Sequence, residues 1–569
     1  MNKLIQKIFE NRGYTQDFLR EVNNPEYPPL KDIDTLCVRL KEIHDQGLRI
    51  TVYPDFDFDG IGSGVIGYGG LCELGFNAAL YIPDPTAGYG ISQESVADLM
   101  YKYPGTNVII SCDTGIGAME AATYCRNAGI EFIVTDHHKQ DIIIPASIIV
   151  NPQRRDETYP HKICGAFVFW QVLMRYAELY GNYMMQDQIA RLKVFAGIGT
   201  ISDSMPLLYE NRQIVRDAVM ICRLIYGDGT TSAVSCIDGT DQYKLAFWGL
   251  YDFLKVCEDN GVIKSAEDID EGFFGWYLAP IFNSAKRMDG DMEKVFGIFF
   301  CGNVGPDNPR QQYAQYLYQA NDARKELVAN KLNEILIAPQ PYAPYIYISD
   351  AKPGILGLLA TKLMQRSGVP TFVMADYGVK TDGNRYSGSG RAPEWFNAIT
   401  LLHDIDYFFI AGHEQAFGCG VDTETHLGQF YNYLSTLVPN VMSQVEIVET
   451  KPDYVIDTEW GKGDIGIDIG VFDDYLTEIE DYKPFGKGFE APRGCIHFRN
   501  SEVIKWSRIG KNKHLKITLP GGLDILCWNQ GPLISQKDKF EEHTVYGNLG
   551  RSEFMGIMSI NFTGEFVEQ

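Results

Sequence analysis

The sequence predicts an α/β protein of several domains, with a parallel-sheet core, a second α/β domain joined to it by a helical connector, and a C-terminal OB-like β-barrel. Short apolar runs alternate with helical patterns from Leu48 to about Val150, which is the pattern of βαβ units. A second alternation of this kind starts near residue 342. From about residue 450, short alternating runs are separated by glycine turns, as in small all-β barrels.

The predicted elements follow in order along the chain. Two helices, over residues 4–13 and 32–47, each end on a glycine and form an N-terminal lead-in. The core strands are expected at residues 48–53, 78–82, 107–112, 130–135 and 147–150. A helical pattern then begins at Cys164. We therefore predict five parts: a lead-in (1–46), the core (47–226), the connector (227–335), the second α/β domain (336–440) and the OB-like domain (441–569).

Composition excludes several classes of protein. Hydrophobic residues at 45% and charged residues at 22% are near the soluble average, which argues against a disordered or fibrous chain. The first residues, MNKLIQKIFENRGYT, lack the apolar segment of a signal peptide, and no apolar run reaches the roughly 18 residues of a membrane span. We expect a cytoplasmic protein with no membrane partner. Twelve cysteines without a C-x-x-C pair predict reduced, mostly buried thiols.

The formal net charge of −24 argues against a nucleic-acid partner, because phosphate binding needs a basic surface. The charge is unevenly distributed, however. Residues 446–481 hold twelve acidic residues against two lysines, whereas residues 501–520 hold five basic residues against one glutamate. Trp506 lies in this basic stretch, whose Lys511, Lys513 and Lys516 could meet phosphates while bases stack on the aromatic ring. A solvated barrel face is the alternative.

Three alternate carboxylates, Asp55, Asp57 and Asp59, directly follow the apolar run ITVY. They are expected at the C-terminal end of a strand, the edge at which open α/β sheets bind ligands. If the chain is extended there, the period of two places all three on one face, where their charges repel. A divalent cation would relieve that repulsion. A solvated acidic loop is the alternative for this motif alone.

Three other motifs repeat this placement at the end of an apolar run. VIISC leads to Asp113, FIVT leads to Asp136-His137-His138, and AGIGTIS leads to Asp203. A mixed set of carboxylates and imidazoles favours Mn²⁺ or Mg²⁺, whereas a zinc site rich in thiolates would need cysteine ligands. Neighbouring histidines in a strand face opposite ways, so one is expected as a ligand and the other as a positioning or proton-handling group, unless the chain turns there.

These motifs, in this order and spacing, resemble those of the DHH phosphoesterase superfamily. Beyond the core, the chain resembles the RecJ single-strand-specific exonucleases over nearly its whole length. The matching signatures are Asn151-Pro152, Cys164-Gly165-Ala166, Pro206-Leu207 with Asn211-Arg212, Asn283-Ser-Ala-Lys-Arg287, Gly354-Ile-Leu-Gly357, Gly388-Ser-Gly-Arg391, Gly412-His413 and Pro484-Phe-Gly486.

The resemblance implies two Mn²⁺ or Mg²⁺ ions, with Asp113 bridging them and His138 close to the scissile phosphate. The implied metal ligands are Asp55, Asp57, Asp59, Asp113, His137 and Asp203, and the implied catalytic residues are His138, Asp136 and Asp113. Two positions depart from the family pattern. Tyr53 stands where many members place a histidine ligand, and Phe282 stands where RecJ proteins usually have an arginine.

In this family the second α/β domain is the DHH-associated domain, which captures the 5′ end of the substrate. The implied substrate-binding residues are Ser389, Arg391, His413, Arg287 and Asn283. The glycines around Ser389 would let backbone N–H groups approach an anion, while Arg391 would contact phosphate. An ordinary glycine turn with a surface arginine is the alternative.

The resulting hypothesis is a metal-dependent 5′→3′ exonuclease that hydrolyses single-stranded DNA in repair and recombination. A helicase or a single-strand binding protein would be its partner. Two alternatives stay open: a DHH-type phosphodiesterase for short oligonucleotides or cyclic dinucleotides, and a non-catalytic DNA-binding scaffold.

Overall fold

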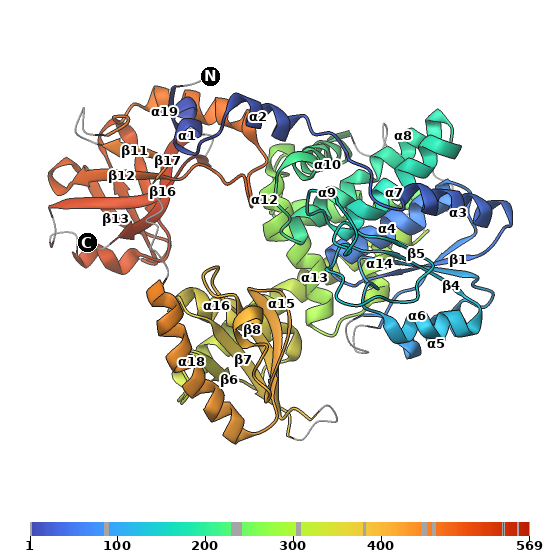
Figure 1. The fold of residues 1–569 in the computed structure, drawn as a ribbon. Helices are drawn as coiled ribbons and strands as arrows, with labels where there is room; N and C mark the ends of the chain where they lie inside the picture. Colours follow the sequence, from blue (N-terminus) through green and yellow to red (C-terminus); the bar gives the residue numbers. More distant parts are fainter. Residues whose placement is uncertain are drawn as a thin grey trace. The chain divides into compact units, whose positions relative to one another are not determined.

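A computed structural model describes residues 3–84, 90–228, 242–302, 309–378, 383–444, 452–457, 463–536, 539, 541–554 and 557–567 (Figure 1). The chain divides into two compact units. The larger unit comprises Pro28–Met205 and Asp217–Ile447, and the smaller unit comprises Met1–Tyr27, Pro206–Arg216 and Val448–Gln569. The division of the sequence into five domains stays a prediction.

The larger unit contains a parallel five-stranded sheet in the order β2-β1-β3-β4-β5. Its strands are β1 (Ile50–Pro54), β2 (Ala78–Leu80), β3 (Val108–Cys112), β4 (Glu131–Thr135) and β5 (Ile148–Val150). The strands β1 and β3 are buried on both faces, as expected when helices cover a parallel sheet on each side. The predicted βαβ core is therefore confirmed.

Alternate residues of these strands face two helical layers. Tyr53, Ile109 and Val134 share a core cluster with residues of α5 and α6, and Figure 1 shows α3, α4 and α7 on the other side of the sheet. The helices of this core are α3 (Ile33–Asp45), α4 (Phe58–Glu73), α5 (Gln93–Lys102), α6 (Met119–Ala128), α7 (Gly165–Tyr180), α8 (Tyr183–Arg191) and α9 (Lys193–Ser202). The helix α4 contains several glycines, which let α7 and α9 pack closely against it.

The connector is helical, as predicted. Its described residues form α11 (Gln242–Asp259), α12 (Glu271–Phe273), a π-helical turn (Phe274–Leu278), α13 (Ala279–Arg287), α14 (Met292–Phe300) and α15 (Pro309–Ile337). The helix α10 (Tyr209–Asp228) precedes them and lies almost wholly in the predicted core. A buried ion pair joins two of these helices: Nε of Arg310 on α15 lies 2.7 Å from Oδ2 of Asp252 on α11. Gln311 also donates to Asp252, so both carboxylate oxygens have partners.

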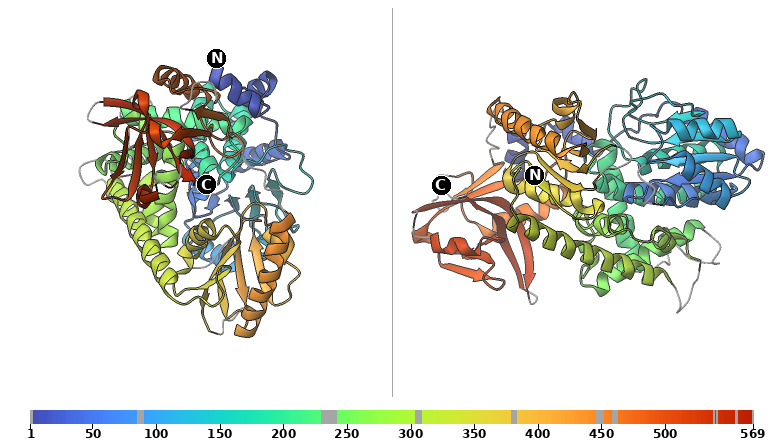
Figure 2. Two further views of the ribbon diagram at one scale, coloured as in Figure 1. Left: turned by 90° about the vertical axis from the view of Figure 1, so that its left-hand side faces the viewer. Right: turned by 90° about the horizontal axis from the view of Figure 1, so that it is seen from below.

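A second, mixed sheet has the order β6-β7-β8-β10-β9. Its strands are β6 (Ile346–Ile348), β7 (Thr371–Asp376), β8 (Tyr386–Arg391), β9 (Phe408–Gly412) and β10 (Ala416–Val421), with helices α16 (Pro353–Ser367), α17 (Ala398–Leu402) and α18 (Glu424–Gln444). Along β7, Phe372 and Met374 pack with α18, whereas Val373 and Ala375 pack with α16. Helices therefore cover both faces of this sheet (Figure 2).

The smaller unit contains a seven-stranded sheet in the order β11-β12-β16-β17-β15-β14-β13. Its elements are α1 (Lys3–Asn11), α2 (Gln16–Asn23), β11 (Tyr454–Asp457), α19 (Ile469–Glu478), β12 (Gly494–Arg499), β13 (Lys505–Ile509), β14 (His514–Thr518), β15 (Asp524–Cys527), β16 (Glu542–Phe554) and β17 (Ile557–Val567). Parts of the acidic stretch, residues 446–451 and 458–462, lie outside the described residues.

The N-terminal helices belong to the core of this smaller unit. Leu4, Ile5 and Ile8 share an apolar cluster with residues of β11, β12 and β14. The buried Arg212 guanidinium joins three segments, because it donates to the Asn23 side chain and the Pro484 carbonyl and lies 4.0 Å from the centre of the Phe489 ring. Removing the chain from about residue 450 would therefore expose the apolar faces of α1 and α2.

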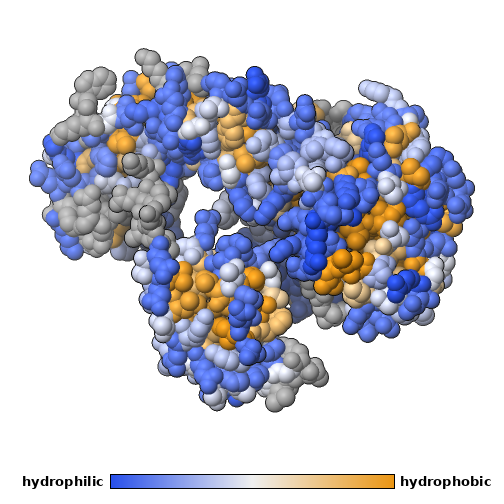
Figure 3. All heavy atoms as spheres, in the orientation of Figure 1, coloured by the Kyte–Doolittle hydropathy of each residue, from blue (hydrophilic) through white to orange (hydrophobic). Residues whose placement is uncertain are grey.

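The cysteines of the described segments are free thiols, and all of them except Cys72 and Cys301 are buried. Within the same segments, no helix combines the length and the apolar character that crossing a membrane would need. Hydrophilic residues dominate the visible surface, with hydrophobic patches between them (Figure 3).

The ion pair between α11 and α15 provides a test of how the connector is held together. We expect Asp252→Ala to lower the free energy of unfolding by about 3 kcal/mol, because it leaves the Arg310 charge buried without its carboxylate. The matched control is Asp322→Ala on α15, whose exposed pair with Lys325 should contribute less than about 1 kcal/mol. Urea unfolding of both variants measures the difference, and equal losses would contradict it.

Candidate metal and phosphate site

The acid loop, residues Asp55–Asp59, links β1 to α4. Asp57 is the N-cap of α4, and its Oδ1 accepts hydrogen bonds from the backbone N–H groups of Asp59 and Gly60. The expectation of an extended chain with all three acids on one face is wrong, because the backbone turns into α4 at Phe58. The turn still brings oxygens of Asp55, Asp57 and Asp113 within 4.8 Å of one another.

Asp59 lies in the first turn of α4 and anchors a second helix. Its two oxygens accept hydrogen bonds from the backbone N–H groups of Gly165 (2.7 Å) and Ala166 (3.1 Å), where α7 begins. A helix N-terminus favours such a carboxylate, because its first N–H groups lack partners within the helix. A side chain at residue 165 would not fit beside Asp113, since a Cβ at Gly165 would lie 2.6 Å from the Asp113 side chain.

Asp113 and Asp203 reach the site from other elements. Asp113 directly follows β3, and its backbone is in the left-handed region, with φ of 60°. Asp203 ends the helix α9, so it lies at the end of a helix and not of a strand. Nε2 of His137 lies 3.1 Å from Oδ1 of Asp113 and 3.6 Å from Oδ2 of Asp203.

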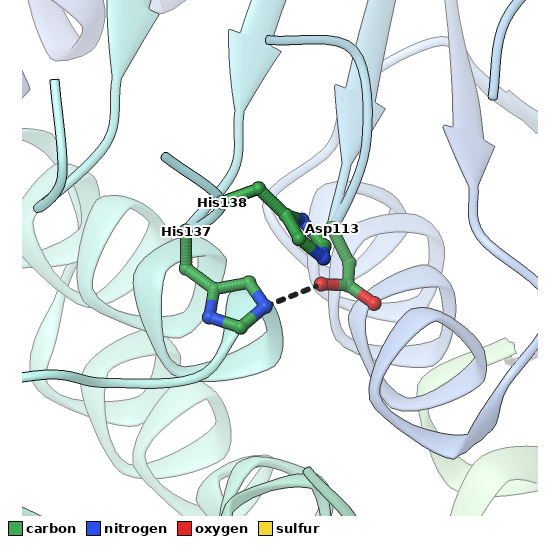
Figure 4. A group of neighbouring side chains, drawn as sticks. All are labelled: Asp113, His137 and His138. Carbon is green, nitrogen blue, oxygen red and sulfur yellow. Dashed lines mark ion pairs between the residues drawn. The ribbon is translucent and has the colours of Figure 1, made fainter. Parts of the chain in front are cut away.

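His137 and His138 both point toward Asp113 (Figure 4). The strand β4 ends at Thr135, so the chain has already turned and the two rings lie on the same side, with centroids 4.5 Å apart. Asp136 holds this turn: its Oδ1 accepts hydrogen bonds from the N–H groups of His137 and His138 and lies 2.8 Å from Nδ1 of His138. Its Oδ2 accepts from the N–H of Ile116, so both oxygens of Asp136 hold the turn in place.

The charges of this turn are strongly coupled. Burial alone would lower the pKa of His138, but the hydrogen bond and the charge of Asp136 raise it to about 9. Burial likewise opposes ionisation of Asp136, yet the same hydrogen bond from His138 keeps the Asp136 pKa below its usual value. Burial lowers the pKa of His137, which favours the neutral imidazole that a metal ion requires.

The donor set fits a hard divalent cation. Groups of ligand atoms within 4.8 Å are formed by Asp113, His137 and His138; by Asp59, His137 and Asp203; and by Asp55, Asp57 and Asp113. Among the described residues, Nδ1 of His137 is buried without a hydrogen-bond partner, and Oδ1 of Asp113 is buried with no hydrogen bond, although Nε2 of His137 lies 3.1 Å away. Burial and the nearby Asp57 carboxylate raise the pKa of Asp55 to about 7, and burial with the Asp59 charge raises the pKa of Asp113 well above its usual value. Bound cations would offset the free-energy cost of keeping these buried carboxylates ionised.

Tyr53 and Phe282, which depart from the family pattern, both lie in apolar cores. Tyr53 is buried beside Tyr81, with ring centroids 5.0 Å apart. Phe282 packs against Phe58, Phe253 and Phe299. Neither side chain belongs to a candidate metal group of the described residues.

The GSGR segment lies within the strand β8 and is not a glycine turn. A Cβ at Gly388 would lie 2.0 Å from the Val373 carbonyl oxygen, and one at Gly390 would lie 2.0 Å from the Phe417 ring, so close packing requires both glycines. Arg391 ends this strand, and its Nη1 donates to the Ser389 hydroxyl (3.1 Å) and the Gly390 carbonyl (2.7 Å).

Arg391 is part of an arginine cluster with Arg287 and Arg324. The Arg391 guanidinium lies against Gly357 of α16, where a Cβ would be 2.7 Å from Nη2. Burial lowers the pKa of all three arginines, and the charge of Arg287 adds to the lowering at Arg324 and Arg391. Such a concentration of positive charge favours an anion. Sequence reasoning missed Arg324, because a single arginine on the long α15 gives no local signal.

Two other predicted substrate residues have different surroundings. His413 lies in the turn between β9 and β10, and its ring is stacked with that of His138, with centroids 6.3 Å apart. The predicted His413 therefore lies beside His138, a member of one candidate metal group. Asn283 instead accepts a hydrogen bond from the backbone N–H of Phe58 (2.8 Å), which ties α13 to the start of α4.

The basic stretch of the smaller unit includes a turn between β13 and β14. Lys511 and Lys513 are exposed there, whereas Lys516 pairs with Asp524 (2.7 Å). Trp506 packs against the core cluster, which leaves less of its ring for stacking. Sequence reasoning missed Trp528, whose side chain is 51% exposed and which contacts the His514 ring.

Comparisons with known proteins agree with this architecture. A profile of the DHH family, N-terminal domain, matches residues 49–198, and one of the RecJ OB domain matches residues 467–565. The single-stranded-DNA-specific exonuclease RecJ of Bacillus subtilis is 27% identical over 575 residues, which cover 98% of this chain and 65% of that protein. The protein of that name from Escherichia coli is 24% identical over 591 residues, covering 98% of this chain and 94% of the other.

Solved structures show the same fold. RecJ from Thermus thermophilus in complex with Mn²⁺ aligns over 100% of this chain and 76% of that chain, with a TM-score of 0.75 and 22% identity. An exonuclease RecJ bound to manganese covers 74% of this chain and 98% of its own, with a TM-score of 0.56 and 24% identity. Residues 49–198 therefore match the DHH family, residues 467–565 match the RecJ OB domain, and nearly the whole chain is similar to RecJ exonucleases in sequence and in fold.

Proposed function

We propose that the chain is a metal-dependent exonuclease that hydrolyses single-stranded DNA from the 5′ end. The observation that supports this best is the buried set of acids and imidazoles at one sheet edge, with a cluster of arginines in the same unit. The first can hold divalent cations, and the second can hold a terminal phosphate. Relatives named single-stranded-DNA-specific exonucleases, matched over nearly the whole chain, support the substrate class.

The metal ligands would be Asp55, Asp57, Asp59, Asp113, His137 and Asp203, which supply the three candidate groups together with His138. Asp113 belongs to two of these groups, which suits a bridging carboxylate. We propose two ions, either Mn²⁺ or Mg²⁺. When bound, they would activate a water molecule and neutralise charge that develops on the phosphate.

The neighbouring residues would position groups and move a proton. Asp136 orients His138 through the contact between its Oδ1 and Nδ1 of the ring. In this orientation His138 would donate a proton to the leaving oxygen. His413, stacked with His138, would contact the substrate on the side of the DHH-associated domain.

The arginine cluster would set the polarity of the reaction. Arg391 can contact a 5′-phosphate together with Ser389, while Arg287 adds charge and Arg324 extends the cluster. Planar guanidinium groups bind phosphate oxygens with two parallel hydrogen bonds. Asn283 would contribute through its hold on α4, which keeps the acid loop in place.

In the smaller unit we propose that Trp528 stacks on a base while Lys511 and Lys513 contact phosphates.

A helicase or a single-strand binding protein would supply single strands, in repair or recombination. A cytoplasmic location stays a prediction.

An end-labelled oligonucleotide tests the function. With Mn²⁺, we expect release of mononucleotides from the 5′ end of a long single strand. Asp113→Asn should reduce the rate by more than about 100-fold, because a ligand shared by two metal groups is lost. The fold should survive, since asparagine tolerates the left-handed backbone at this position.

The same assay separates the alternatives. Turnover of only dinucleotides or cyclic dinucleotides would favour the small-substrate phosphodiesterase. Binding of the strand without hydrolysis, in Mn²⁺ and in Mg²⁺, would favour a scaffold and contradict the proposal.

Arg391→Ala should weaken the preference for 5′-phosphorylated ends while changing kcat on saturating substrate much less, because the guanidinium holds the terminal phosphate. The matched control is Arg385→Ala, which removes the arginine that directly precedes β8 and pairs with Asp376. We measure kcat/KM on strands with and without the 5′-phosphate. An unchanged ratio for Arg391→Ala would exclude it as the end sensor.

In the smaller unit, replacing Lys511 and Lys513 together by alanine should flatten the salt dependence of binding to a long strand. Each lost phosphate contact on a single strand reduces the slope by roughly 0.7. Lys516→Ala is the control, because its charge is already paired with Asp524. Titration at several salt concentrations gives the slopes, and an unchanged slope for the double variant would show that these lysines do not contact DNA.

A further inference from the structure

Lys286 places a positive charge beside the acid loop. It lies on α13, and its Nζ is 3.6 Å from the centre of the Phe56 ring. Phe56 stands between Asp55 and Asp57, so the aromatic ring that supports the ammonium belongs to the acid loop itself. A cation over an aromatic face at this distance is attracted by the ring electrons, more strongly when water is excluded.

The helix α13 is fixed in the register that presents this lysine. Asn283, one turn earlier on α13, accepts the hydrogen bond from the backbone N–H of Phe58, and Phe282 packs edge-on against the Phe58 ring at 5.1 Å. Residues three apart lie on the same face of a helix. Asn283 and Lys286 therefore both face the acid loop, the first as a tether and the second as a charge.

The acids that act on Lys286 are the three members of one candidate metal group. Burial lowers the pKa of Lys286, and the charges of Asp55, Asp57 and Asp113 oppose that lowering. The same three carboxylates offer ligand oxygens within 4.8 Å of one another. The lysine in turn helps to lower the pKa of Asp55 against the effect of burial.

We propose that Lys286 is a built-in cation that shares the Asp55–Asp57–Asp113 group with a divalent ion and reduces the affinity of that group for the ion. This inference rests on the proposed function, because it takes the acid group as a metal site. The ammonium offsets part of the repulsion among the acids when no metal is bound. It also repels an arriving divalent cation, so the group binds the cation less tightly than the same three carboxylates would without the lysine.

The consequence is that metal binding and the stability of the metal-free protein change in opposite directions when the charge is removed. Lys286→Met keeps much of the length and apolar stem of the side chain but loses the ammonium. We expect one class of its Mn²⁺ sites to bind the ion roughly 10-fold more tightly than in the unaltered chain. In EDTA it should unfold at a lower temperature than the unaltered chain, because its acids have lost a counter-charge.

Isothermal titration calorimetry of the metal-stripped full-length chain with MnCl₂ measures the affinity for Mn²⁺. Thermal unfolding in EDTA measures the stability of the metal-free protein. Lys325→Met is the matched control, since it removes an exposed lysine of α15 and should leave both quantities unchanged. Lys286→Arg should keep the affinity of the unaltered chain. If Lys286→Met fails to fold, Lys286→Gln is the second neutral variant.

The outcomes separate this inference from the proposed function. Tight Mn²⁺ binding by the unaltered chain with equal or weaker binding by Lys286→Met would overturn the role of the lysine and leave the metal site standing. No Mn²⁺ binding by the unaltered chain would overturn both.

Discussion

Several aspartates of the larger unit lie close together at the carboxyl edge of a parallel sheet. The elements around this edge have to hold these negative charges together. Strands β1, β3 and β4 end side by side, and each is followed by an aspartate that cannot spread away from the others. Burial makes this arrangement costly, as the raised pKa values of Asp55 and Asp113 indicate. The neighbouring elements reduce that cost with helix N–H groups, an imidazole and an ammonium. Divalent cations would reduce it further, which links the stability of the edge to its chemistry.

Much of the site consists of residues that hold others in place. Asp59 accepts hydrogen bonds from the first N–H groups of α7, and Asp136 holds both histidines in place through its hydrogen bonds. Asn283 ties the connector to α4 by one hydrogen bond. These contacts fix the backbone where a displacement of about 1 Å would separate the ligand atoms. The loops carry the functional groups, while helices that pack against them limit their movement.

The positive charges are also concentrated at particular places in the chain. The formal charge of the chain is −24, yet arginines gather at one place in the larger unit and exposed lysines at the β13–β14 turn of the smaller unit. Many acidic side chains elsewhere meet lysine or arginine partners on the surface, where such pairs contribute little. A strongly acidic protein can therefore bind a polyanion, because salt screens the distant acids and leaves the local charge to decide the interaction.

The sequence by itself determined the order of the elements and the position of Asp55, Asp113, Asp136 and both histidines at strand ends, because these features depend on local periodicity and on neighbours in the chain. It could not decide that the acid loop turns into a helix, that Gly388 and Gly390 lie within a strand, or that Asn283 binds the first turn of α4. Nor could it place Lys286 over Phe56, join Arg324 to Arg391, or bury α1 in the core of the smaller unit. These contacts join residues far apart in the sequence, and their geometry depends on how whole helices and strands pack against one another.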